Sequence, residues 1–281
     1  MQTADFDYYL PPELIAQTPI EPRDHARLLV LNRNNDAVEH LNFYDLTKIL
    51  RSGDVLVLNK TRVLPARLNG NRSETGGKIE ILLLRRIKPG IWEALVRPGR
   101  TLQVGAWFSV GKQGANMVTG QILEVGEKGM RTVSLSDDSS IAEFGQVALP
   151  PYIHNSLEDP SRYQTIYASE EGSVAAPTAG LHFTSELLGL IQEMGVEIVE
   201  ILLHIGLDTF RPVQVDKITD HKLHTEYYSI SAEAAHSINV AKMEKRRIVC
   251  VGTTSVRALE QSALKGDGKV IPGSGWADLF I

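Results

Sequence analysis

The sequence predicts an α/β protein, of mixed α/β and α+β character, that is interrupted by an inserted small antiparallel β-barrel. Helical and strand patterns alternate near the start of the chain and again after residue 150, which is typical of a sheet covered by helices. Between them, short β-rich runs recur between glycine-bearing turns, with no helical period. We therefore expect a discontinuous α/β domain formed by residues 1–62 and 150–281, and a barrel domain formed by residues 63–149.

The hydrophobic pattern places the elements of the α/β domain in order. Apolar strands are expected at residues 28–32 and 54–59, on either side of a short helix at 43–50. After the barrel, an apolar face recurs at helical spacing between Thr184, a suitable N-cap, and Gly195, a suitable C-terminal stop. The remaining elements are a strand at 196–205, a helix opened by Ser231, a strand at 247–252 and a helix at 254–265.

The barrel is predicted from five β-rich runs, KIEILLL, IWEALV, AWFSV, MVTGQILEV and RTVSL. Breakers such as NGNRSETGG, KPG, RPGR and EKG separate them at intervals that suit hairpins. The block is long enough to fold by itself.

Composition limits the classes of protein that fit. The chain of 281 residues is 43% hydrophobic and 22% charged, an ordinary mixture for a protein with a buried core. No apolar run approaches the roughly 20 residues of a membrane span, and the opening residues lack the pattern of a secretory signal. The single cysteine, Cys250, excludes an internal disulfide framework and a cysteine-rich zinc site. We expect a cytoplasmic protein with no membrane partner.

The segment SVAAPTAGLHFT, which begins at Ser173, consists almost entirely of small residues and places His182 just before a predicted helix. Small residues allow the backbone to approach another group closely, and a helix N-terminus is a natural anion site. A tight connection between elements explains the same composition, so both interpretations stay open.

Polar side chains also follow two of the predicted strands. In VGTTSVR, the residues Thr253, Thr254 and Ser255 lie where a strand turns into a helix, a position that suits helix capping as well as binding of a carboxylate or phosphate. Arg257 lies in the first helical turn, where a cation opposes the helix dipole. In LLHIGLDTFRPV, His204 ends a strand, and Arg211 follows with a planar group suited to clamping an anion.

The segment DHKLHTEYY contains His221, His224 and Glu226. A His-x-x-His pair can bind zinc, with the glutamate as ligand or base, but zinc hydrolases usually place two histidines four residues apart on a helix. The same side chains serve equally well in hydrogen bonding or proton transfer.

Basic residues cluster at 59–67, 84–90, 96–100 and 244–247, although the net charge is −5. Only the contacting face of a protein needs to neutralise phosphates, so an RNA partner remains possible.

Several of these motifs together carry a family resemblance. PTAGLHFT, LHIGLDTFRPV, HKLHTEYY, VGTTSVRALE, NKTRVLPARL and the opening YYLPPELIAQTPIEPRDHARLLVL resemble the S-adenosylmethionine:tRNA ribosyltransferase-isomerases of queuosine biosynthesis. The resemblance implies transfer and isomerisation of the ribosyl group of S-adenosylmethionine onto 7-aminomethyl-7-deazaguanine (preQ1) at the tRNA wobble position. The products are epoxyqueuosine, adenine and methionine.

The resemblance also implies residue roles, with S-adenosylmethionine as co-substrate. We expect no metal and a monomeric chain. Residues 175–180 would be small so that the backbone lies against the bound nucleoside or a flipped base. The acid and base candidates are His182, His204, His224 and Glu226. The residues expected to hold S-adenosylmethionine are Thr178, Ala179, Gly180, Arg211, Thr253, Thr254, Ser255 and Arg257. Those expected to face the tRNA are Asn59, Arg62 and Arg67.

The family pattern continues beyond residue 281, with a Pro-Gly turn and an Asn-Phe-His-Leu-Pro motif expected after DLFI. We expect residues 264–280 to form a flexible loop, DLFI to lie in a strand, and a form ending there to bind ligands without turnover if the further block lines the site. Two rival functions remain. One is a non-catalytic RNA-binding protein, and the other is a metal-dependent hydrolase that uses His221, His224 and Glu226.

Overall fold

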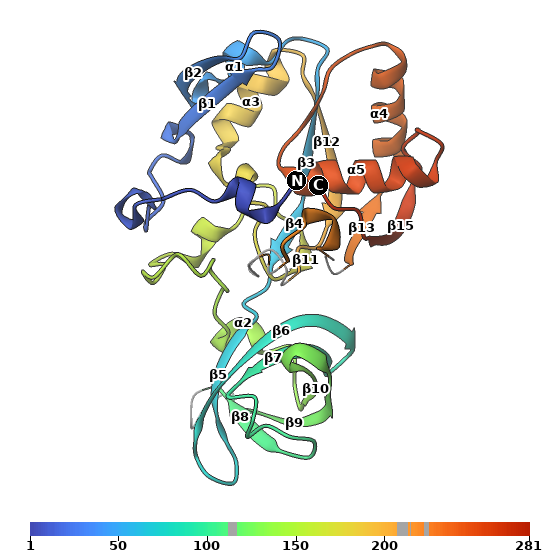
Figure 1. Ribbon diagram of the computed structural model, residues 1–281. Helices are drawn as coiled ribbons and strands as arrows, with labels where there is room; N and C mark the ends of the chain where they lie inside the picture. Colours follow the sequence, from blue (N-terminus) through green and yellow to red (C-terminus); the bar gives the residue numbers. More distant parts are fainter. Residues whose placement is uncertain (112–116, 207–212, 214, 222–224) are drawn as a thin grey trace. The chain divides into compact units, whose positions relative to one another are not determined.

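The computed structural model describes residues 1–281 apart from 112–116, 207–212, 214 and 222–224 (Figure 1). The chain divides into two units. Met1–Arg62, Pro151–Glu170 and Ala176–Ile281 form the first unit, and Val63–Pro150 with Glu171–Ala175 forms the second.

A five-stranded mixed sheet organises the first unit. Its strand order is β14 (Ile248–Cys250), β3 (Val55–Asn59), β12 (Glu197–Leu203), β13 (Glu226–Ile230) and β15 (Gly273–Ala277). The first three strands are parallel, and β13 and β15 continue the sheet in antiparallel pairing. Every residue of β3 is buried, as expected for the continuously apolar central strand of a parallel segment.

Three helices cover this sheet, with α3 (Ser185–Glu193) on one side of β3 and β12 and α4 (Ala232–Met243) and α5 (Thr253–Lys265) on the other (Figure 1). The predicted helix starts are confirmed. Thr184 Oγ1 accepts the Leu187 N–H at 3.1 Å, and Ser231 Oγ accepts the Ala234 N–H at 3.1 Å. Leu187 of α3 lies in one apolar cluster with core residues of β3, which explains the amphipathic pattern read from the sequence.

Shorter elements complete the first unit. They are the hairpin of β1 (Arg27–Asn32) and β2 (Ala37–Asn42), helix α1 (Leu46–Ile49), and the 3-10 helices η1 (Thr3–Phe6), η2 (Pro12–Leu14), η3 (Arg23–His25), η4 (Phe43–Asp45), η6 (Pro160–Tyr163), η7 (Thr178–His182) and η9 (Ile218–Asp220). Where the chain passes from one unit to the other, β4 (Thr61–Val63) pairs with β11 (Glu170–Ser173) in a separate two-stranded sheet.

The predicted strand at 28–32 is confirmed as β1, which pairs with β2 outside the core sheet and leaves Leu29 and Leu31 58% and 56% exposed. Two other expectations about these elements are wrong. The segment expected to be a flexible loop contains β15, whereas DLFI is not a strand. The glycine-rich sequence hid β15, because backbone pairing with β13 decides its conformation more than residue preference does.

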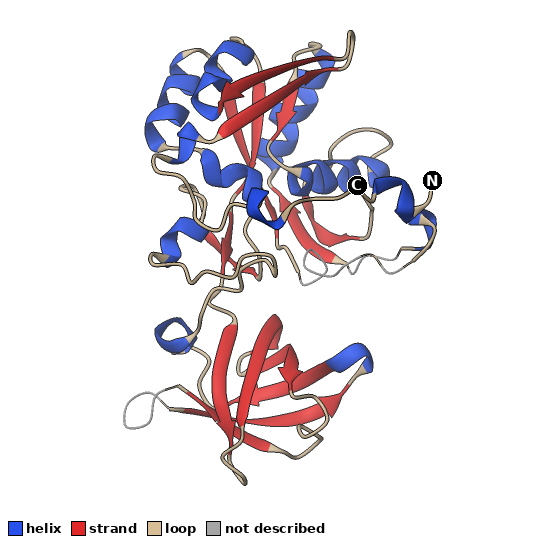
Figure 2. Ribbon diagram, turned by 60° about the vertical axis from the view of Figure 1, so that its left-hand side comes forward, coloured by secondary structure: helices blue, strands red, loops and turns tan. Residues whose placement is uncertain are grey.

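A closed antiparallel barrel forms the second unit. The strand order is β10 (Met130–Leu135), β7 (Ile91–Arg97), β6 (Lys78–Lys88), β5 (Arg67–Arg72), β8 (Trp107–Val110) and β9 (Val118–Val125), accompanied by η5 (Glu127–Gly129) and α2 (Ile141–Phe144). Figure 2 shows the strands curving around a common interior, which Phe108 and other fully buried side chains fill. A Cβ at Gly120 would lie 2.3 Å from Phe108 Cζ, so this close approach requires glycine. The predicted barrel insertion is confirmed.

No helix in the described part of the chain is long and apolar enough to span a bilayer.

Candidate functional site

The carboxyl ends of β14, β3 and β12 lie at one edge of the sheet, because these three strands are parallel. The residues that directly follow them are Val251 and Gly252, Lys60 and Thr61, and His204. Ligands of open α/β sheets bind at this edge. The sequence placed His204 and the Thr253–Ser255 turn at strand ends, and the structure brings both to this sheet edge.

His204 lies in a defined environment at this edge. Its Nδ1 is 2.8 Å from the hydroxyl of Thr61, its backbone N–H donates to Tyr227 O at 2.8 Å, and its ring stacks on that of Tyr227 with centroids 5.8 Å apart. Burial lowers the pKa of His204 below its ordinary value of 6.5, while the Glu170 carboxylate acts in the opposite direction. The neutral ring therefore predominates at neutral pH.

Asn59 is buried inside the sheet, at 1% exposure. Its side-chain amide donates to Leu203 O at 2.9 Å, and its Oδ1 accepts the Leu203 N–H at 3.0 Å and the Thr61 N–H at 3.2 Å. The expectation that Asn59 faces tRNA is wrong. Its polar groups join the ends of β3 and β12, which is how a buried amide avoids losing hydrogen bonds.

The small residues of η7 have a packing function that the sequence did not reveal. A Cβ at Gly180 would lie 2.0 Å from the hydroxyl of Tyr167, and Ala179 Cβ is 3.4 Å from the position that a Cβ on Gly252 would occupy. Thr178 is exposed at the start of η7. Residues 178–180 therefore pack tightly beside the β14–α5 turn, and at Gly180 the protein itself requires the absence of a side chain.

His182 ends η7 and is held by two contacts. Its Nδ1 is 3.2 Å from Ala179 O, and its ring lies 5.2 Å from that of Phe43 between centroids. A carbonyl oxygen only accepts hydrogen bonds, so Nδ1 carries the proton in this contact. When the ring is neutral, Nε2 then has a lone pair, which allows His182 to accept a proton.

Two hydroxyl groups in the turn between β14 and α5 differ in their hydrogen bonding. Ser255 is fully buried, and its hydroxyl donates to Val251 O at 3.0 Å, so it closes the strand end instead of facing a ligand. The expectation that Ser255 lines the ligand site is wrong. Thr253 is exposed, and the buried Oγ1 of Thr254 has no hydrogen-bond partner among the described residues. Gly252, with φ of 82°, makes this turn possible.

Glu226 and Arg257 form a buried ion pair, 2.5 Å between Oε2 and the guanidinium, with both residues 7% exposed. Glu226 Oε1 also accepts the Gly206 N–H at 2.8 Å, and Arg257 donates to Ala277 O at 3.0 Å. The expected roles, Glu226 as acid or base and Arg257 as a ligand clamp, are therefore wrong. Each neutralises the other, and together they join β13, α5 and β15.

The remaining expected ligand-binding positions are only partly described. Arg211 and His224 lie outside the described residues. His221 packs against Phe280, with ring centroids 5.5 Å apart, and Glu226 is occupied by Arg257. Within the described residues, no group of three histidine, cysteine or carboxylate side chains is placed to hold a metal ion.

The two arginines expected to face tRNA differ in exposure. Arg62 is exposed on β4, and one of its guanidinium nitrogens is 3.4 Å from Ala168 O. Arg67 in β5 is half-buried, and its Nε lies 3.9 Å from the Glu80 carboxylate.

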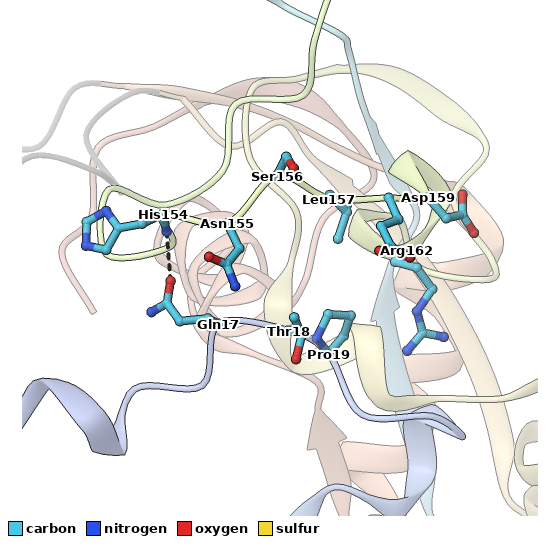
Figure 3. Close-up of a pocket in the computed structure, with 10 residues that line it drawn as sticks. Gln17, Thr18, Pro19, His154, Asn155, Ser156, Leu157, Asp159 and Arg162 are labelled. Carbon is cyan, nitrogen blue, oxygen red and sulfur yellow. Dashed lines mark hydrogen bonds between the residues drawn. The ribbon is translucent and has the colours of Figure 1, made fainter.

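A separate pocket of about 580 Å³ lies elsewhere in the first unit (Figure 3). Gln17, Thr18 and Pro19 form one wall, and residues 154–159 with Arg162 form the other. Gln17 joins the walls, because its Oε1 accepts the His154 N–H at 2.8 Å. None of the site residues predicted from the sequence lines this pocket, although Gln17, Thr18 and Pro19 belong to the opening motif YYLPPELIAQTPIEPRDHARLLVL.

Comparison with known proteins identifies the family. Residues 3–281 match the family model described as "Queuosine biosynthesis protein". The S-adenosylmethionine:tRNA ribosyltransferase-isomerase of Carboxydothermus hydrogenoformans is 52% identical to this chain, and the enzyme of the same name from Symbiobacterium thermophilum is 50% identical. Each alignment covers 100% of this chain and 82% of the relative.

Among solved structures, the S-adenosylmethionine tRNA ribosyltransferase of Thermotoga maritima is 34% identical, with 99% of this chain and 78% of that chain covered and a TM-score of 0.47. The match to the family model over nearly the whole chain and the identities of about one half show that this chain belongs to the family of queuosine biosynthesis proteins.

Proposed function

We propose that this chain is an S-adenosylmethionine:tRNA ribosyltransferase-isomerase. It transfers the ribosyl group of S-adenosylmethionine to preQ1 at the wobble position of a tRNA and isomerises it to give epoxyqueuosine, with release of adenine and methionine. The relatives that carry this name are similar over the whole length of the chain.

The observation that supports this function best is the position of His204 and of the hydroxyl-bearing β14–α5 turn at one sheet edge, with η7 packed beside that turn. His204 follows β12, the hydroxyl-bearing turn follows β14, and η7 with His182 touches that turn through Ala179 and Gly252. Proton-transfer groups and an anion-binding turn are what this reaction requires, because a proton must leave the carbon beside the sulfonium and the departing adenine must be stabilised.

His182 is the base in this proposal. The lone pair on Nε2 takes the proton, and the resulting imidazolium keeps its Nδ1–H directed at Ala179 O, which stabilises the charged ring. General base catalysis of this kind typically contributes 10² to 10⁴ in rate.

The β14–α5 turn fits the methionine carboxylate of the co-substrate. The unpartnered Thr254 hydroxyl and the backbone N–H groups at the start of the thirteen-residue helix α5 are donors that suit an anion. S-adenosylmethionine supplies the ribosyl group and a sulfonium that acidifies the neighbouring C–H. The residues of the chain bind, orient and deprotonate it.

Arg62 contributes to tRNA binding in this proposal, since it is exposed. The reaction takes place in the cytoplasm, a single chain carries it out, and no metal participates.

Adenine release from S-adenosylmethionine tests the function. We expect release that depends on an anticodon stem-loop carrying preQ1, with none from a matched stem-loop carrying guanine. His182→Ala should lower the rate at least a hundredfold and leave S-adenosylmethionine binding in place, because only proton transfer is lost. Failure of the unaltered protein to bind either substrate would contradict the proposed reaction, and full activity of His182→Ala would remove its role as base.

A further inference from the structure

We propose that Thr61 is a positioning residue that holds His204 with its ring proton on Nε2, so that His204 acts as a hydrogen-bond donor and not as a base. The role of His204 in the reaction rests on the proposed function, whereas the tautomer itself does not. Thr61 belongs to the motif NKTRVLPARL, in which the sequence pointed to Asn59, Arg62 and Arg67 but assigned no role to Thr61.

The direction of the Thr61–His204 hydrogen bond follows from burial. Thr61 is completely buried, and His204 Nδ1, at 2.8 Å, is the only hydrogen-bond partner of its hydroxyl among the residues that the structure describes. If Nδ1–H donated to Thr61, the hydroxyl proton would face no acceptor, and leaving a buried donor unsatisfied destabilises the fold. The hydroxyl therefore donates to Nδ1, and the single proton of the neutral ring lies on Nε2.

Both partners are fixed by the same buried amide. Asn59 Oδ1 accepts the backbone N–H groups of Thr61 and of Leu203, the residue directly before His204. The backbone N–H of His204 is held by Tyr227 O, and the Tyr227 ring stacks on the imidazole. Such a frame fixes the orientation of a reacting side chain through its neighbours.

This arrangement separates the functions of the two histidines. His182 has its proton on Nδ1 and a lone pair on Nε2, whereas His204 has the opposite tautomer. A neutral imidazole with its proton on Nε2 stabilises negative charge that develops on a leaving group without giving up its proton. We infer that His182 removes the proton and that His204 donates a hydrogen bond to the departing adenine.

The tautomer can be measured by NMR of the free protein with ¹⁵N-labelled histidine, recorded near pH 7.5. His204→Gln identifies the His204 signals by their loss. We expect a protonated Nε2 and an unprotonated Nδ1 in the unaltered protein and in Thr61→Ser. Thr61→Val, which removes the hydroxyl at similar volume, should populate the other tautomer.

Thr165→Val is the matched control. Thr165 is also a buried threonine of the first unit, and its hydroxyl has no partner among the described residues. The His204 signals should be unchanged in this variant. Adenine release should fall about ten- to a hundredfold in Thr61→Val and recover in Thr61→Ser, the size typical of losing a group that orients a reacting side chain.

A protonated Nδ1 on His204 in the unaltered protein, or an unchanged Nε2 proton in Thr61→Val, would overturn the proposal. An unaltered protein that has the expected tautomer but binds neither S-adenosylmethionine nor the preQ1 stem-loop would support the positioning by Thr61 and contradict the proposed reaction, so the two failures are distinguishable.

Discussion

Gly180 lies so close to the hydroxyl of Tyr167 that a Cβ would be 2.0 Å from that oxygen. The hydroxyl is buried and has no hydrogen-bond partner among the described residues, and burial raises the pKa of Tyr167 above its ordinary value. The sequence linked the small residues of η7 to a ligand. At Gly180, however, the neighbouring Tyr167 side chain is what excludes a larger residue.

We predict that Gly180→Ala destabilises the protein by about 1–3 kcal/mol, because the added methyl group overpacks the site. Tyr167→Phe alone should be nearly neutral, since it removes a hydroxyl that makes no hydrogen bond. In the double variant, Tyr167→Phe should relieve much of the destabilisation caused by Gly180→Ala. Urea unfolding would then show that the changes in unfolding free energy of the two single variants do not add up to that of the double variant. Strictly additive effects would contradict the contact.

The sequence predicted where the candidate side chains lie along the chain better than it predicted their partners. His182, His204 and the Thr253–Thr254 turn lie at helix and strand ends as expected, because the hydrophobic pattern locates such ends well. The roles of Asn59, Glu226 and Arg257 were misassigned, because a buried polar residue is defined by its partner. For Asn59 that partner is Leu203, 144 positions away, and a single sequence carries no signal of such pairing.

The strands of the core sheet are tied together by ion pairs at both ends. Asp54 and Arg247 pair directly before β3 and β14, with Arg247 Nε donating to Asp54 Oδ1 at 2.8 Å. Glu226 and Arg257 pair near the opposite edge. The sequence located β3, β12 and β14, whereas it missed β15 and also β5, whose segment RLNGNR has one fully buried apolar residue and reads as a turn.

Breaking the Glu226–Arg257 pair should strongly destabilise the fold. We predict that Glu226→Gln costs about 3–5 kcal/mol in urea unfolding, because the buried Arg257 guanidinium loses the negative charge of the Glu226 carboxylate. Glu226→Leu combined with Arg257→Met should cost less than the sum of the two single changes. Glu93→Gln, which breaks the more exposed Arg85–Glu93 pair, is the control and should cost less than about 1 kcal/mol. Equal losses of unfolding free energy in the two glutamine variants would show that burial of the Glu226–Arg257 pair does not determine its effect on stability.

The Asp54–Arg247 pair predicts a pH dependence of stability. The hydrogen bond from Arg247, with a further one from the Arg51 N–H, holds the pKa of Asp54 below its ordinary value of 3.8. The unfolded chain therefore binds this proton first, and the stabilisation is present above about pH 4 and lost as the pH falls through the folded value. Asp54→Asn should lower stability at pH 7 and flatten its decline between about pH 5 and 2. An unchanged slope would contradict the assignment.

At the scale of the whole molecule, an acidic protein is proposed to bind an anionic partner. Because the net charge is −5, contacts with phosphates depend on local cations such as the exposed Arg62. The sequence predicted the sheet with a barrel insertion, since repeated short strands and alternating helices and strands are long-range patterns. The sequence did not predict which arginines are exposed and which lie in ion pairs, because both depend on residues that are distant along the chain.

We predict that binding of the preQ1 stem-loop weakens with salt, and that Arg62→Gln reduces the slope of log affinity against log salt by about 1. Arg85→Gln should leave the slope unchanged, because Arg85 already forms a two-pronged pair with Glu93 at 2.7 and 2.8 Å. Fluorescence anisotropy over a salt series measures both. Equal slopes for Arg62→Gln and the unaltered protein would exclude Arg62 from the phosphate contacts.

The most direct test of the central claim is a crystal structure with S-adenosylmethionine bound. We expect the ligand at the carboxyl ends of β14, β3 and β12, with its carboxylate at the Gly252–Thr254 turn and its sulfonium beside His182. A ligand seated in the pocket formed by Gln17 and Arg162, or on the barrel, would contradict the assignment of the sheet edge as the reaction site.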